Sequence, residues 1–93
     1  MKIIELSEAA KEAIIAYRKI LDVPVNHYLR VGISQKNASD KQLLIGFDIK
    51  TEKDKLAECD GITIIYNPGQ AIFFAGMIID FDERDGKKGF VLK

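Results

Sequence analysis

The sequence has little sulfur and imidazole: its 93 residues include one cysteine, Cys59, and one histidine, His27. One thiol cannot form an intrachain disulfide, which excludes a secreted domain built on disulfides. Structural zinc needs several cysteine or histidine ligands, and this chain cannot supply them. A catalytic Cys–His pair needs a hydrogen bond between the two side chains and a third group that orients the histidine. We interpret Cys59 as a small residue at a strand end and His27 as a surface residue in a loop.

An excess of charge of one sign is also missing, as are long apolar runs. Lysine plus arginine equals aspartate plus glutamate at 14 each, so no general field attracts phosphate backbones or anionic membranes. No run approaches the ~18 apolar residues of a membrane span, and residues 1–10 do not read as a signal peptide. We therefore predict a cytoplasmic protein that binds neither nucleic acid nor membrane. Near-zero net charge favours self-association, and we expect a homodimer.

The sequence motifs of common enzymes are absent. There is no glycine-rich phosphate loop and no Gly-x-Ser-x-Gly elbow. Asp48 and Asp80 lie among apolar residues, and we interpret both as carboxylates on the solvent face of a strand. The acidic run at residues 80–86 departs from a calcium loop at Arg84 and lacks the closing glutamate, so a solvated turn is predicted there. We expect no enzymatic activity and no catalytic residue.

A helix is the clearest element that the sequence does contain. Ser7 stands where a hydroxyl can cap the first turn, and apolar residues then recur at spacings of three and four. Asp22 and Pro24 end this pattern, because proline disfavours helical backbone in the residue before it. We predict a helix over Ser7–Leu21 in a single domain covering residues 1–93.

Alternating and β-rich segments follow the helix. They predict strands at Tyr28–Ser34, Leu43–Ile49, Leu56–Cys59, Ile62–Tyr66, Met77–Phe81 and Lys88–Leu92. Asp60-Gly61 suits a tight hairpin turn, Gln35–Lys41 is expected to be a loop or a loose strand extension, and Gln70–Phe74 one helical turn. Nothing after Leu21 offers a long helical crossover. The predicted class is α+β, with the N-terminal helix packed on small, mainly antiparallel or mixed β-sheets.

Four stretches in this order resemble the HesB-like (IscA-like) A-type iron–sulfur carriers. They are the opening IIELSEAAKEAI from Ile3, LRVGI from Leu29, DGITII from Asp60, and AGMIIDF from Ala75 followed by Gly89-Phe90. The resemblance covers almost the whole chain. It implies a HesB-like domain that forms dimers or larger oligomers and takes part in iron–sulfur cluster assembly.

The ligand positions of that family are not retained. Its loop cysteine falls on Ala38, beside Ser39, and its C-terminal Cys-x-Cys has no counterpart before Lys93. Cys59 lies where the family has no ligand, and a methyl group cannot replace a thiolate. We expect a degenerate member with no cofactor or metal, unable to bind a cluster by itself and acting as an accessory or partner-binding subunit. The alternative is a cluster-free interaction or small-ligand-binding module that reuses the fold.

Overall fold

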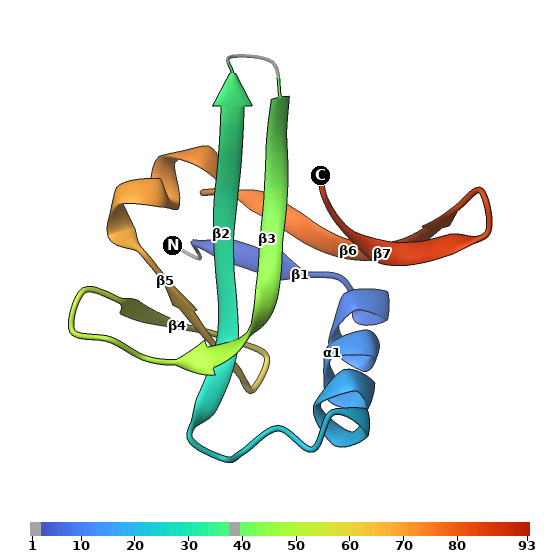
Figure 1. The fold of residues 1–93 in the computed structure, drawn as a ribbon, viewed down its shortest axis with the longest axis horizontal. Helices are drawn as coiled ribbons and strands as arrows, with labels where there is room; N and C mark the ends of the chain where they lie inside the picture. Colours follow the sequence, from blue (N-terminus) through green and yellow to red (C-terminus); the bar gives the residue numbers. More distant parts are fainter. Residues whose placement is uncertain (1–2, 38–39) are drawn as a thin grey trace.

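The chain folds into two β-sheets and one α-helix, seen in a computed structural model that describes residues 3–37 and 40–93 (Figure 1). The elements are β1 (Ile4–Leu6), α1 (Glu8–Ile20), β2 (His27–Asn37), β3 (Asp40–Ile49), β4 (Lys55–Cys59), β5 (Ile62–Tyr66), the 3-10 helix η1 (Pro68–Phe73), β6 (Met77–Arg84) and β7 (Lys87–Leu92). The strand order is β1-β6-β7 in one sheet and β3-β2-β5-β4 in the other. Pairs β1–β6 and β2–β5 are parallel and the other neighbours are antiparallel, so the predicted mixed α+β architecture is confirmed.

Ser7, the predicted cap, holds the start of α1 in place through two hydrogen bonds of its hydroxyl group. Its Oγ accepts a hydrogen bond from the Ala10 backbone N–H at 3.1 Å and donates one to Asp80 Oδ1 at 2.5 Å. The first bond satisfies one free N–H of the helix, and the second ties this end to β6. Ala10 and Ile14 are buried on the inner face of the helix. The predicted helix is thus confirmed to within one residue at each end.

Two Asp-Gly pairs make the tight turns. Asp60 and Gly61 have positive φ between β4 and β5, as predicted, and Asp85 and Gly86 repeat this between β6 and β7. Positive φ at both central residues matches the twist of a two-residue hairpin. The solvated turn predicted at residues 80–86 was therefore wrong over residues 80–84, because the acidic run continues as strand to Arg84 and turns at once.

The strands β2 and β3 are longer than their composition predicts. Pairing continues from His27 opposite Ile49 up to Asn37 opposite Asp40, with one irregularity near the end. Of the two alternatives expected at Gln35–Lys41, the strand extension is the one observed in the described residues: residues 35–37 belong to β2 and residues 40–41 to β3, because pairing with a neighbouring strand outweighs polar composition. His27, expected in a loop, is the first residue of β2.

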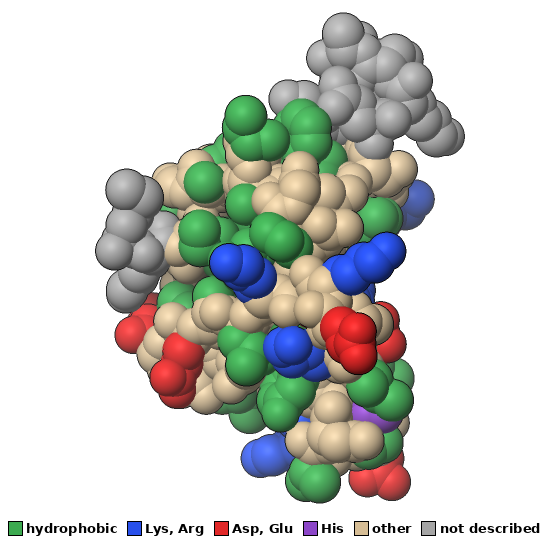
Figure 2. Space-filling model, turned by 90° about the vertical axis from the view of Figure 1, so that its left-hand side faces the viewer, with side chains coloured by type: hydrophobic (Ala, Val, Ile, Leu, Met, Phe, Trp, Pro, Cys, Tyr) green, Lys and Arg blue, Asp and Glu red, His purple; other side chains and the backbone are tan. Residues whose placement is uncertain are grey.

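The core lies between α1 and the inner faces of both sheets. It includes Leu29, Val31 and Ile33 from β2, Ile64 and Tyr66 from β5, Phe74, and Ile79 from β6. On the outside, the face carrying η1 and β4 mixes hydrophobic side chains with charges of both signs (Figure 2). Within residues 3–37 and 40–93, no helix is long and apolar enough to cross a membrane.

A side chain of η1 takes the place of a strand beside β2. Strand β5 ends at Tyr66, which is opposite Val31, so Ile33 extends beyond it. There the Gln70 amide donates to the Ile33 carbonyl at 2.9 Å, and its Oε1 accepts from the Ile33 N–H at 3.2 Å. The amide thereby satisfies both backbone groups of a residue that is 6% exposed.

Candidate functional site

The side chains of Cys59 and His27 make their polar contacts with different residues. Cys59 is the last residue of β4 and is 2% exposed, with its Sγ 4.0 Å from Asp60 Oδ2. His27 Nδ1 is instead 3.1 Å from Asn26 Oδ1. No hydrogen bond joins the two side chains in the described part of the chain. A buried thiol of this kind behaves as a small apolar core residue.

The donors present do not fit an iron–sulfur cluster. Clusters are held by several cysteine thiolates, whereas this sequence has one cysteine, and it is buried. Ala38, where the family ligand was predicted to fall, lies outside the described residues, as does Ser39. Among residues 3–37 and 40–93, no group of three or more histidine, cysteine or acidic side chains is placed to hold a metal ion.

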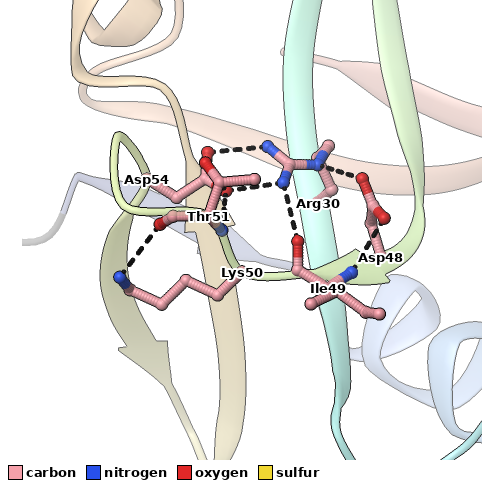
Figure 3. Close-up of polar contacts among 6 residues, drawn as sticks. All are labelled: Arg30, Asp48, Ile49, Lys50, Thr51 and Asp54. Atoms are coloured by element: carbon pink, nitrogen blue, oxygen red, sulfur yellow. Dashed lines mark hydrogen bonds and ion pairs between the residues drawn. The ribbon is translucent and has the colours of Figure 1, made fainter.

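The most extensive polar cluster surrounds Arg30, the arginine of the LRVGI stretch (Figure 3). Its two terminal nitrogens donate to both oxygens of Asp54 at 2.8 and 2.6 Å, and Nε donates to Asp48 at 2.8 Å. Asp54 also accepts from the Thr51 backbone N–H at 2.8 Å and from its hydroxyl at 3.0 Å. The cluster thus joins β2, the end of β3 and the loop that leads into β4.

The charges in this cluster stabilise one another. The Arg30 guanidinium and the Thr51 N–H hold the pKa of Asp54 well below its ordinary value, and Asp54 raises the pKa of Arg30. The Asp54 side chain is 4% exposed, whereas that of Asp48 is 56% exposed. A bidentate arginine–carboxylate pair that closes a loop explains all these contacts. We therefore assign the cluster a structural role.

Asp80, predicted on a solvent face, instead links Ser7, which precedes α1, to Lys93, which follows β7. It accepts hydrogen bonds from the Lys93 ammonium at 2.8 Å, the Ser7 hydroxyl and the Phe81 backbone N–H. These contacts, led by that of Lys93, lower the pKa of Asp80 to about 2. We therefore assign this carboxylate a role in stabilising the fold rather than in proton transfer.

These contacts of Asp80 predict a loss of stability in acid. The pKa of Asp80 is lower in the folded state than its ordinary value. The ionised carboxylate therefore contributes fully to the stability of the fold above about pH 5, and this contribution is lost as the pH falls through about 4 towards 2. Urea unfolding should show the free energy of unfolding decreasing as the pH is lowered from about 6 to about 2. In Asp80→Asn the fall should be shallower. An unchanged slope in that variant would contradict the assignment.

A groove separates α1 from the four-stranded sheet. Its larger part, with a volume of about 410 Å³, is lined by Lys11, Ile14, Ile15 and Arg18 of α1, Tyr28, Leu29 and Phe47 of the sheet, and residues 60–63. A second part of about 230 Å³ shares Ile14, Leu29 and Phe47 and adds apolar residues such as Ile45 and Phe90. The two parts therefore share an apolar floor formed by Ile14, Leu29 and Phe47.

Two cationic side chains border the larger part of the groove. Lys11 contacts Glu8 at 2.6 Å and Asp60 at 2.9 Å, and these carboxylates raise the pKa of its ammonium. Arg18 donates through Nη2 to the backbone carbonyls of Pro24 and His27, and its guanidinium carbon lies 5.6 Å from the centre of the Phe47 ring. Arg18 could not be singled out from the sequence, because its position in the last helical turn already accounts for a positive charge.

Comparison with known proteins identifies the fold. No protein-family model matches the sequence, and no curated protein sequence does. Among solved structures, the crystal structure of Escherichia coli SufA, involved in biosynthesis of iron–sulfur clusters, matches with a TM-score of 0.69 and 20% identity over 97% of this chain and 83% of SufA. The crystal structure of IscA with a [2Fe-2S] cluster gives a TM-score of 0.73 and 19% identity over 97% of this chain and 80% of IscA.

A third structure extends the match to the full chain. The solution NMR structure of a protein from Aquifex aeolicus gives a TM-score of 0.74 and 23% identity over 100% of this chain and 92% of its own. The chain therefore has the fold of SufA and IscA, as the resemblance implied. At these identities the comparison concerns the fold alone.

Proposed function

We propose that residues 1–93 form one HesB-like domain that acts in iron–sulfur cluster assembly as an accessory or partner-binding subunit, without holding a cluster itself. The link to cluster assembly is supported by the fold, which is shared with a protein of cluster biosynthesis and with one that holds a [2Fe-2S] cluster. The proposed role is that of a binding protein rather than an enzyme, and its proposed location is the cytoplasm.

The burial of Cys59 carries the second half of the proposal. Its thiol is the one thiolate donor that the sequence offers, and it is 2% exposed within the core. Binding iron through it would require the hairpin of β4 and β5 to open. Soft thiolate ligands are what an iron–sulfur cluster needs, so this domain is better suited to contact a cluster-bearing protein than to replace one.

An exposed apolar surface is available for such a contact. In η1, Ile72 is 82% exposed and Phe73 is 37% exposed. The Ile72 side chain lies outside the core, where a protein partner or a second copy of the chain could cover it. We propose a protein partner or a homodimer as the bound state.

Anaerobic reconstitution with ferrous iron and sulfide tests the proposal. We expect no visible-region absorption in the wild-type protein or in Cys59→Ala, while IscA, whose structure contains a [2Fe-2S] cluster, serves as the positive control when treated in the same way. A cluster spectrum in the wild-type protein that Cys59→Ala abolishes would contradict the claim that the domain holds no cluster.

The accessory role needs a separate measurement. We expect the purified domain to co-elute in size-exclusion chromatography with a cysteine-bearing carrier from the same cell, loaded with its cluster. Ile72→Asp should weaken that complex, because it places a charge on the exposed apolar face of η1. Independent elution of the domain and every such carrier would contradict the role.

The groove beside α1 favours a second candidate function, a cluster-free module that binds a small ligand. Its volume of about 410 Å³ falls in the range of small-molecule sites, roughly 300–1,000 Å³. Its floor is apolar and its border is charged, which is the composition that such sites share.

A further inference from the structure

We propose that the groove between α1 and the four-stranded sheet binds a small amphipathic monocarboxylate, with the carboxylate at Arg18 and the apolar part against Phe47. The inference concerns a different surface from the exposed face of η1 and does not depend on any role in cluster assembly.

The charge at Arg18 has no acidic partner in the described part of the chain. Its hydrogen bonds go to the carbonyls of Pro24 and His27, both through Nη2, which leaves Nε and Nη1 available. Backbone carbonyls orient a guanidinium without cancelling its positive charge. Arginine in this state is suited to a carboxylate, which it can bind through two parallel hydrogen bonds.

The apolar residues adjoining Arg18 select a ligand with a hydrocarbon body. Ile14 and Leu29 are 3% and 2% exposed, and both line each part of the groove together with Phe47. The Arg18 guanidinium already lies against the Phe47 ring, so a carboxylate on Arg18 would place its own chain along this floor. A hydrocarbon chain that lies on this floor removes its own apolar surface from water, which favours binding.

The other end of the groove limits the ligand to one negative charge. Lys11 is already contacted by the carboxylates of Glu8 and Asp60, and Asp60 itself lines the groove. A second anionic group on the ligand would therefore meet a carboxylate rather than a free cation. Dicarboxylates and phosphate esters with two charges are disfavoured for this reason.

Isothermal titration calorimetry with three eight-carbon probes tests the proposal on the wild-type protein. We expect octanoate to bind, octanamide to bind about tenfold more weakly because it lacks the charge, and octanedioate to bind more weakly than octanoate. Amide chemical shifts in ¹⁵N-labelled protein should change along α1 and around Phe47. Absence of octanoate binding, equal affinity for octanoate and octanamide, or shift changes confined to another surface would overturn the proposal.

A pair of variants separates Arg18 from the general charge of the helix. Arg18→Gln should reduce octanoate affinity about tenfold, whereas Lys19→Gln, which removes a charge from the next, exposed position, should change it less than twofold. Far-UV circular dichroism checks that each variant folds. Should Arg18→Gln fail to fold, Arg18→Lys is used instead, and it should retain preference for octanoate over octanamide. Equal losses in the glutamine variants, or loss of that preference in Arg18→Lys, would overturn the assignment of Arg18.

Discussion

Replacing Asp54 with alanine is expected to lower the free energy of unfolding by about 3 kcal/mol. The substitution removes both hydrogen bonds from Arg30 and both from Thr51 at once. It also leaves a guanidinium that is 29% exposed without its buried carboxylate. Breaking one side of a buried charge pair costs more than the pair contributes, because the remaining charge is poorly solvated.

The matched control is Asp48→Ala, which removes the other carboxylate bound to the same arginine. Its side chain is 56% exposed, and exposed ion pairs contribute about 0–1 kcal/mol. Urea denaturation of both variants at neutral pH, followed by circular dichroism, gives the two free energies. Equal losses in the two variants would show that burial of Asp54 does not govern the cluster.

Gln70→Ala is expected to cost about 2 kcal/mol of unfolding free energy, since it leaves the N–H and the carbonyl of Ile33 without their partner. Gly32→Ala should cost about 1–2 kcal/mol by the same route. A Cβ at position 32 would lie 2.9 Å from Gln70 Oε1, so the amide must move away from Ile33. The two substitutions thus damage one interaction.

A double-mutant cycle measures that coupling. In the Gln70→Ala background, Gly32→Ala should cost nothing or stabilise slightly, because the next atom that the new methyl meets is Leu44 Cβ at 4.0 Å and alanine restricts the unfolded chain. Gly46→Ala on the adjacent strand is the control, with no atom within 4 Å of its Cβ. Additive effects of the pair in urea denaturation would rule out the coupling.

The parts of the fold that depend on neighbouring residues could be predicted from the sequence. The Ser7 cap, the apolar spacing of α1 and the Asp60-Gly61 turn are local signals, and each predicted its element. The Asp85-Gly86 turn carries the same signal, which could have found the second hairpin. The length of β2 beyond Ser34 could not be read locally, because it depends on pairing with β3.

The polar clusters depend on contacts between distant residues and could not be predicted in the same way. Arg30 and Asp54 are 24 positions apart, and no periodicity indicates that the loop after β3 turns back over β2. Arg18 is similar, since its proposed role as an anion site depends on Phe47 across the groove and on the absence of an acidic partner among residues 3–37 and 40–93. In contrast, the shortage of thiolate ligands could be read directly from the sequence, because it contains one cysteine. The structure adds that this cysteine is buried.

The parallel pairing of β1 with β6 joins segments that are far apart along the chain. Ile4, Glu5 and Leu6 align with Met77, Ile78 and Ile79, and the Ser7 hydroxyl reaches Asp80 across 73 positions. Such long-range pairing slows folding. It also leaves β1 unpaired until β6 is in place, which exposes folding intermediates to aggregation.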